Sequence, residues 1–273
     1  MLYVISSHIG NLGDITLRAL EILKKCNYIL CEDTRRSRIL LDHFGIQKPL
    51  KSFHKFSEKK EEKGILEDLR EGVEIGLLSD AGTPTIADPG RELIVKVIEE
   101  GLPFTALPGP CSLIQGLVLS GFPSERFQFL GFLSKKESEG LKVLRSMLFF
   151  NGTSICYVPP NRLVSTLEYL YQLSPVANIG VARELTKIHE ECVRGIPSQL
   201  ITHFKNNPPK GEIVLLVEKG KIEEEEIPLD ELLPLLQESF SLSLKEAIKM
   251  AAKLLGKPKK IIYNKTHERI HKV

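Results

Sequence analysis

Short apolar segments alternate with longer amphipathic segments along the chain, and this alternation constrains the fold more than any other feature. In the first half, runs with strand character occur at residues 2–6, 28–31, 73–78 and 103–107, and the segments between them have helical spacing. Such alternation is typical of a largely parallel sheet covered by helices on both faces. The sequence therefore predicts an α/β fold.

The predicted helices begin and end at residues that are typical of helix termini. Asp14 is placed to cap the first helix, and Gly45 to end the second in a left-handed conformation. Pro89 is expected to open a further helix that Gly101 closes.

The pattern restarts near residue 122, with strands expected at 127–130, 154–158, 179–183 and 213–218, and helices near 141–148 and 163–173. Gly121 and Pro123 interrupt the helix that follows Pro110, so we expect a domain junction there. The predicted organisation is an N-terminal α/β domain (1–121), a C-terminal α/β domain (122–222) and a helical basic extension (223–273).

The extension is acidic at its start and basic at its end. We interpret the acidic run 223–226 as a solvated linker, and Ser243 to Glu246 as a capping box that opens a helix. Gly256 would end that helix, and residues 261–263 would begin another. From Lys245 onward, nine Lys or Arg residues face two Glu residues. A helix-turn-helix module and a docking arm with a solvated basic face both fit.

Composition excludes several classes of protein. The chain has 273 residues, is 42% hydrophobic and carries a formal net charge of +2, so charge alone does not indicate nucleic-acid binding. The seven histidines show no metal-ligand spacing, and the five cysteines form no Cys-x-x-Cys pair. No signal peptide or membrane span is recognisable, so we expect a cytoplasmic protein that binds no metal.

Four loops that follow predicted strands contain residues suited to ligand binding, because ligands bind at the carboxyl ends of parallel strands. Loop 7–14 contains two glycines and fits a ligand or a simple tight turn. Loop 32–36 joins two carboxylates to Arg35 and Arg36, and fits a polar substrate site or a structural ion-pair cluster.

The other two loops favour a ligand more strongly. Loop 79–90 is stiff and closely approachable, and its Asp80 and Asp88 would accept hydrogen bonds from hydroxyls or an ammonium group, although Asp88 also fits a helix cap. Loop 108–112 precedes a helix whose N-terminus would offer free N–H groups to a carboxylate.

Taken together, these loops resemble the tetrapyrrole-methylase superfamily, and within it the ribosomal RNA small subunit methyltransferase I family. The resemblance covers almost the whole chain, in order: Ile-Gly-Asn-Leu (9–12), Glu-Asp-Thr-Arg (32–35), Ser-Asp-Ala-Gly-Thr-Pro (79–84), Asp-Pro-Gly (88–90), Pro-Gly-Pro (108–110), Ser-Gly-Phe-Pro (120–123), Gly-Phe-Leu (131–133), Ala-Arg-Glu-Leu-Thr-Lys (182–187) and Lys-Gly-Glu-Ile-Val (210–214).

The resemblance implies two α/β domains with S-adenosylmethionine (SAM) in the cleft between them. It also implies 2′-O-methylation of a cytidine ribose in 16S ribosomal RNA, by a homodimer that acts on the RNA or the small ribosomal subunit. Carried over by position, the SAM pocket would consist of His8, Asp80, Ala81, Thr83, Cys111, Ser112, Tyr157, Val158, Ala182 and Gly211.

Several positions depart from the family pattern. Ser7 and His8 stand where Thr-Pro is usual, and Phe56 and Ser57 where His and Asn are common. Ser134 replaces a usual Pro, and Gly140 a basic residue. These departures affect expected substrate contacts more than the SAM pocket.

We place the chemistry of methyl transfer on five residues that would surround the acceptor ribose and its phosphates. Lys187 would favour the developing alkoxide, and a carboxylate would take its proton. The set is Glu32, Asp33, Arg35, Glu184 and Lys187. An alternative is that Arg183, Glu184 and Lys187 form interdomain ion pairs.

Three other functions remain open from the sequence. A methylase of a tetrapyrrole or another small molecule, and a protein-modifying methylase such as diphthine synthase, would use the same cofactor loops. A non-catalytic RNA-binding module would need the basic extension but not those loops.

Overall fold

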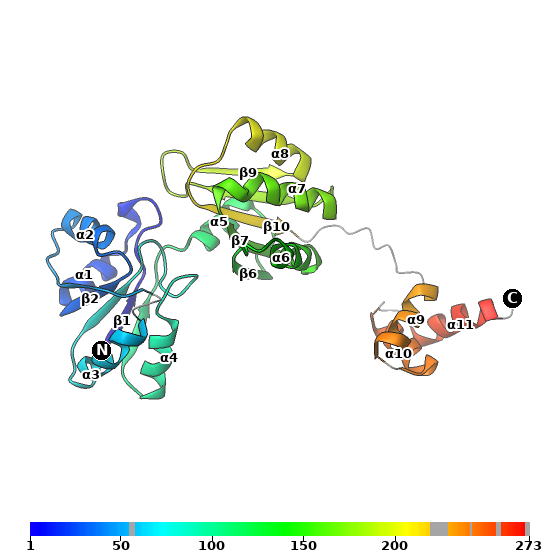
Figure 1. The fold of residues 1–273 in the computed structure, drawn as a ribbon, viewed down its shortest axis with the longest axis horizontal. Helices are drawn as coiled ribbons and strands as arrows, with labels where there is room; N and C mark the ends of the chain where they lie inside the picture. Colours follow the sequence, from blue (N-terminus) through cyan, green and yellow to red (C-terminus); the bar gives the residue numbers. More distant parts are fainter. Residues whose placement is uncertain (55–57, 219–228, 241, 255–257, 271–273) are drawn as a thin grey trace. The chain divides into compact units, whose positions relative to one another are not determined.

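The computed structural model describes residues 1–54, 58–218, 229–240, 242–254 and 258–270. The chain divides into two compact units, Met1–Gly220 and Lys221–Val273. The first unit contains two five-stranded sheets with helices against them, and the second consists of helices (Figure 1). The predicted α/β fold is therefore confirmed; the division after residue 121 stays a prediction.

The first sheet is entirely parallel, with strand order β3-β2-β4-β1-β5. Its strands are β1 (Leu2–Ile5), β2 (Tyr28–Cys31), β3 (Leu50–Ser52), β4 (Ile75–Leu78) and β5 (Phe104–Leu107). The connecting segments contain the short 3₁₀ helix η1 (Leu12–Asp14) and helices α1 (Leu17–Lys25), α2 (Thr34–His43), α3 (Glu58–Arg70) and α4 (Arg91–Glu99).

Alternate residues of β1 face opposite sides of this sheet. Leu2 and Val4 belong to one buried cluster with residues of α3 and α4, whereas Tyr3 and Ile5 belong to another with residues of α1 and α2. Successive side chains of a strand point to opposite faces of its sheet. Both faces of this sheet are apolar because helices cover both of them.

The second sheet differs from the expected restart of a parallel pattern. Its order is β6-β7-β10-β8-β9, and only the β6–β7 pair is parallel. Its strands are β6 (Phe127–Phe132), β7 (Thr153–Val158), β8 (Ile179–Arg183), β9 (Glu191–Gly195) and β10 (Ile213–Glu218). The short β8–β9 connection allows an antiparallel pair, which a crossover helix would not.

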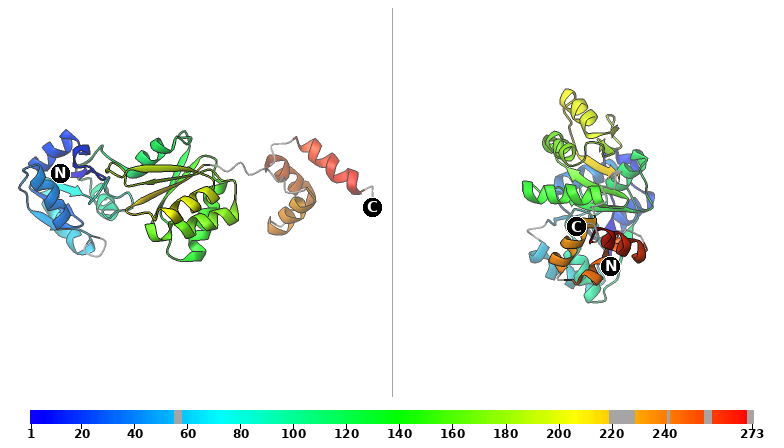
Figure 2. Two further views of the ribbon diagram at one scale, coloured as in Figure 1. Left: turned by 90° about the horizontal axis from the view of Figure 1, so that it is seen from above. Right: turned by 90° about the vertical axis from the view of Figure 1, so that its right-hand side faces the viewer.

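Helices cover both faces of the second sheet (Figure 2). The larger core includes residues of α6 (Glu137–Phe149), α7 (Leu163–Leu173) and α8 (Pro197–Asn206), with η2 (Pro160–Arg162) preceding α7. On the other face lies α5 (Ser112–Ser120), whose Leu113 and Leu117 pack with Val214 and Ala182. Gly116 permits this approach, because a Cβ there would lie 3.0 Å from Val214 Cγ1.

The second unit is a three-helix cluster of α9 (Leu229–Phe240), α10 (Leu244–Leu254) and α11 (Lys259–Ile270) with its own buried core. The capping box is confirmed: Ser243 N and Oγ donate to Glu246 Oε2 at 3.0 and 2.6 Å. The acidic run 223–226, Gly256, Phe56 and Ser57 lie outside the described residues.

The sequence placed most strands within two residues but missed β3 and β9, as well as α3, α8 and α9. Two helix starts were also wrong. Thr16, not Asp14, caps α1, because its hydroxyl accepts from Ala19 N at 3.1 Å while Asp14 lies in η1. Gly90, with φ of 112°, is the N-cap of α4, so Pro89 lies outside the helix and Asp88 does not cap it.

Candidate functional site

The strand-end loops of the first sheet are bonded to one another. Ser7 N donates to Gly82 O and Gly82 N to His8 O, both at 2.8 Å. Thr83 Oγ1 donates to Pro110 O at 3.1 Å and lies 3.1 Å from Ser6 Oγ. Because β1, β4 and β5 end in register, these loops converge at one edge of the sheet.

Three loops of the second sheet converge in the same way. β10 runs antiparallel to β7 and β8, so its first residue, Ile213, is the register partner of both Val158 and Arg183. The end of β7, the end of β8 and the start of β10 therefore meet at one edge.

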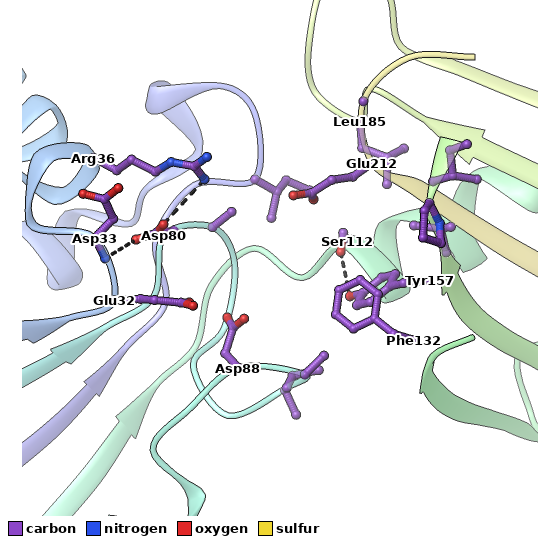
Figure 3. A pocket seen from close by; sticks show the side chains of 18 of the residues that line it. Glu32, Asp33, Arg36, Asp80, Asp88, Ser112, Phe132, Tyr157, Leu185 and Glu212 are labelled. Atoms are coloured by element: carbon purple, nitrogen blue, oxygen red, sulfur yellow. Dashed lines mark hydrogen bonds and ion pairs between the residues drawn. The ribbon is translucent and has the colours of Figure 1, made fainter. Parts of the chain in front are cut away.

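A cavity of about 880 Å³ lies between the two sets of loops (Figure 3). From the first sheet it is lined by Glu32, Asp80 and Asp88, and from the second by Phe132 and Tyr157. Phe132 and Tyr157 are 5.1 Å apart between ring centroids, and Tyr157 Oη lies 2.8 Å from Ser112 Oγ. The cavity thus has an acidic side and an aromatic side.

The structure brings most of the predicted site residues together. All five proposed catalytic residues line this cavity, together with six of the predicted cofactor residues: Glu32, Asp33, Arg35, Glu184, Lys187, Asp80, Ala81, Ser112, Tyr157, Val158 and Gly211. Gly211 has a φ of 75°, a conformation that residues with a side chain rarely adopt, so glycine is favoured there.

Four predicted cofactor residues do not line the cavity. Thr83 joins two loops through its hydroxyl, and Ala182 is fully buried beneath α5. Cys111 is the N-cap of α5 and is partly buried in the same cluster. His8 lies in the first loop, where burial lowers its pKa and its Nδ1 has no hydrogen-bond partner among the described residues.

Asp33 is occupied by local interactions. Its carboxylate caps α2 by accepting from Arg35 N at 2.9 Å, and it also accepts from the Arg35 guanidinium at 2.7 and 3.0 Å. The guanidinium hydrogen bonds hold the pKa of Asp33 far below its usual value. An acid held so firmly ionised is a weak proton acceptor, and the assignment of Asp33 to the catalytic set stays a prediction.

The β8–β9 connection holds its own ion pairs. Lys187 Nζ lies 2.9 Å from Glu184 Oε1, and Arg183 Nε lies 2.6 Å from Glu191 Oε2. Glu184 and Thr186 have φ of 50° and 64°, a conformation that non-glycine residues rarely adopt. All four paired residues come from β8, β9 and the loop between them, so these pairs do not join the two sheets.

Asp88 and Glu212 are cavity residues that the sequence reading did not assign to the site. Burial, and to a smaller extent the neighbouring carboxylates of Glu32, Asp80 and Glu212, together raise the pKa of Asp88 to about 7. Asp88 was visible as an acceptor in loop 79–90. Glu212 lay within a recognised motif, but only the tertiary structure turns it toward the cavity.

Backbone strain accompanies the loop that holds Asp88. Thr85 and Ala87 have φ of 72° and 65° although neither is glycine, and Ala87 lines the cavity. Such residues persist where the surrounding structure imposes them, and they cluster at binding sites. Among the described residues, no group of three metal-ligating side chains is arranged to hold a metal ion, and no helix is long and apolar enough to cross a membrane.

Comparison with known proteins identifies the family and the fold of the chain. The family model for tetrapyrrole (corrin/porphyrin) methylases matches residues 1–201. A diphthine synthase structure superposes with a TM-score of 0.62 at 14% identity, covering 80% of this chain and 89% of that one, which shows a shared fold.

Two curated relatives are closer in sequence. Ribosomal RNA small subunit methyltransferase I of Halalkalibacterium halodurans is 38% identical over 98% of this chain and 94% of its own length. The protein of the same name from Hydrogenobaculum sp. is 45% identical over 80% of this chain and 95% of its own length. The chain therefore belongs to the tetrapyrrole methylases and, within them, to the ribosomal RNA small subunit methyltransferase I family.

Proposed function

We propose that the protein transfers a methyl group from SAM to ribosomal RNA of the small subunit, at the 2′-hydroxyl of a cytidine ribose. The observation that carries the proposal is the cavity between the strand-end loops. It joins a cluster of carboxylates to an aromatic wall, and cationic side chains lie at its margin. The names of the relatives support RNA as the acceptor.

The residues present fit SAM, which carries a sulfonium, an ammonium group and a carboxylate. Glu32, Asp88 and Glu212 face the cavity, and no hydrogen bond or ion pair to another described residue occupies their carboxylates, so they suit a cation. The Cys111 side chain makes no capping hydrogen bond to α5, which leaves that helix N-terminus available to a carboxylate. When bound, SAM would supply the methyl group.

We assign the contacts with SAM to the predicted residues that line the cavity. Tyr157 and Phe132 would present an apolar wall that excludes water, and Ser112 fixes the Tyr157 hydroxyl. The other members are Asp80, Ala81, Val158 and Gly211. His8, Thr83, Cys111 and Ala182 would support these residues from outside the cavity.

We assign RNA phosphates to the basic margin. The side chains of Arg35 and Arg36 are 87% and 69% exposed, and Arg36 lies 3.5 Å from Asp80 Oδ2. Arg35 and Arg36 provide forked donors that match phosphate oxygens, and Lys187 provides a point charge next to Glu184. We therefore assign the carboxylates of the cavity to SAM and its cationic side chains to the RNA phosphates.

Attack by a hydroxyl on a methyl group requires that the hydroxyl lose its proton. Because Asp33 and Glu184 are paired with cations, we place proton acceptance on Glu32 or Asp88.

Mapping labelled methyl groups tests the function. The enzyme is incubated with labelled SAM and, in separate reactions, small ribosomal subunits, free 16S RNA and a tetrapyrrole. We expect label in RNA that resists alkaline hydrolysis at one nucleotide, since a 2′-O-methyl group blocks cleavage there. Label on the tetrapyrrole and none on RNA would instead establish the alternative function, a small-molecule methylase, which the description of the matching family model favours.

Two further expectations rest on the same family. We propose that the protein is a homodimer and that it works in the cytoplasm, where it meets ribosomal RNA. Light scattering of the purified protein measures the first: a molar mass near 61 kDa, twice the 30.7 kDa chain, is expected.

A further inference from the structure

The C-terminal unit presents a row of lysines along one face of α10. Lys245, Lys249 and Lys253 follow one another at intervals of four residues, so they lie one above another on the same side of the helix. All three are exposed, whereas Ala247 and Ile248 are buried against the other helices. We define the lysine row as these three residues.

The lysines of the row repel one another. Like charges four residues apart destabilise a helix, and the row contains two such pairs. Among the described residues no ion pair within 4 Å involves the row. Glu246 accepts from Ser243, and it is also close enough to Lys249 for that lysine to lower its pKa. One carboxylate offsets the repulsion of three lysines only in part, so this face of the helix is suited to an external anion.

The second unit lies outside the part of the chain that the family model matches. The model ends at residue 201, before the second unit begins at Lys221. The Hydrogenobaculum relative matches 80% of this chain but 95% of its own length, so it is the shorter protein.

The chemistry of the surface favours RNA over a membrane or a protein. The apolar face of α10 is buried in the unit's own core and is not available to lipid. α11 begins with the exposed Lys259 and Lys260, and Tyr263, 49% exposed, lies one turn further on. Ammonium groups near an exposed aromatic ring are the combination that binds unpaired nucleotides, through phosphates and stacking.

We propose that the C-terminal unit is an accessory RNA-binding module whose lysine row contacts the phosphate backbone of the substrate RNA. The module raises affinity for RNA and takes no part in methyl transfer. This inference rests on the proposed function for the identity of the RNA.

The test compares two triple variants of the full chain. In the first, Lys245, Lys249 and Lys253 are all changed to Gln; in the control, Lys24, Lys142 and Lys205, which are exposed in the first unit, are changed to Gln. Binding to a 16S RNA fragment is measured by filter retention across a salt series, without SAM. We expect the row variant to bind about tenfold more weakly near 0.1 M salt, with a slope of log K against log salt smaller by about 2.

Further measurements separate the possible results. Changing the row to Arg should preserve affinity, and the Gln variant should keep its melting temperature, its SAM affinity and its kcat at saturating RNA. Wild-type affinity and salt slope in the row variant would overturn the inference. So would a loss confined to assembled subunits with no change on naked RNA, which would indicate a protein partner. Because binding is measured without methyl transfer, a failure to label RNA would overturn the proposed function alone.

Discussion

The two sheets of the first unit contribute chemically different walls to one cavity. The parallel first sheet contributes the carboxylates of Glu32, Asp80 and Asp88, whereas the mixed second sheet contributes the rings of Phe132 and Tyr157. All strands of a parallel sheet end at the same edge, so several polar loops gather there. In the second sheet, β7 and β8 end at the edge where β10 begins. Most of the charged side chains of the cavity therefore come from the first sheet, although the second adds Glu184, Lys187 and Glu212, and the Phe and Tyr rings come from the second sheet.

The largest effect is expected from removing the groups assigned to the chemistry, one from each sheet. Glu32→Ala and Lys187→Ala, made separately, should slow single-turnover methylation by about 10²–10⁴-fold if proton transfer and alkoxide stabilisation depend on them. SAM binding and melting temperature serve as controls. Near-normal single-turnover rates in both variants would remove them from the catalytic set.

The aromatic wall should contribute mainly to packing. Tyr157→Ala removes ring contacts with Phe129 and Phe132, at centroid distances of 5.0 and 5.1 Å, and should lower the free energy of unfolding by about 2–3 kcal/mol. Tyr157→Phe loses only the Ser112 hydrogen bond and should cost about 1 kcal/mol. Urea unfolding measures both. Equal losses in the two variants would show that the hydroxyl, not the ring, matters.

The close packing of the first-sheet loops can be tested with two glycine variants, one inside these loops and one outside them. A Cβ at Gly109 would lie 2.6 Å from Ser6 Cβ, so Gly109→Ala should destabilise the protein by about 1–3 kcal/mol and weaken SAM binding. Gly64, exposed in α3 with no atom within 4 Å of an added Cβ, is the control. Gly64→Ala should stabilise by about 0.5–1 kcal/mol and leave binding unchanged. If both variants melt alike, the loop contact is not tight.

A further prediction concerns the pH dependence of stability that arises from Asp88. Its pKa is raised from 3.8 to about 7 by burial and by neighbouring carboxylates, so the folded protein binds this proton more tightly than the unfolded chain. The resulting stabilisation is fully present below about pH 4 and is lost as the pH rises through about 7. Asp88→Asn should therefore melt higher than the wild type at pH 8, with the difference closing near pH 4.

Without ligand, the folded protein favours the protonated form of Asp88. A cation bound in the cavity should instead favour the ionised form. SAM binding should tighten from pH 6 to pH 8 in the wild type, because the cation favours ionised Asp88, and should stay flat in Asp88→Asn. Calorimetry measures the affinity, and Glu125→Gln, at an exposed carboxylate, is the control. The same pH profile in wild type and Asp88→Asn would contradict the assignment.

Much of the first sheet could be predicted because its signal is local. Strands buried on both faces are continuous apolar runs, so β1, β2, β4 and β5 stand out, and Gly45 and Gly101 mark helix ends with φ of 63° and 64°. One strand in each sheet was missed, β3 in the first and β9 in the second. β9 is only half-buried and contains Glu191 and Arg194, so its polarity conceals a strand that is held by pairing with β8.

The candidate site, too, could be predicted only in part. The strand-end motifs, read by their order and by resemblance, determined which loops carry the site, and eleven of the fifteen assigned residues line the cavity. Sequence alone could not show that the Asp33 carboxylate is occupied by Arg35, or that Thr83 bonds to Pro110 instead of facing the cavity. Side-chain partners depend on which loops meet in space.

The alternation of strands and helices, together with the order of the motifs, was therefore enough to determine the fold class and the family from the amino-acid sequence. Apolar periodicity and turn residues act over a few neighbours, so a linear reading detects them. The tertiary structure alone decided that β10 runs opposite to β7 and β8, which brings Glu212 to the cavity, and that burial among Glu32, Asp80 and Glu212 raises the pKa of Asp88. Those effects depend on distances between residues far apart in the chain, which no local pattern encodes.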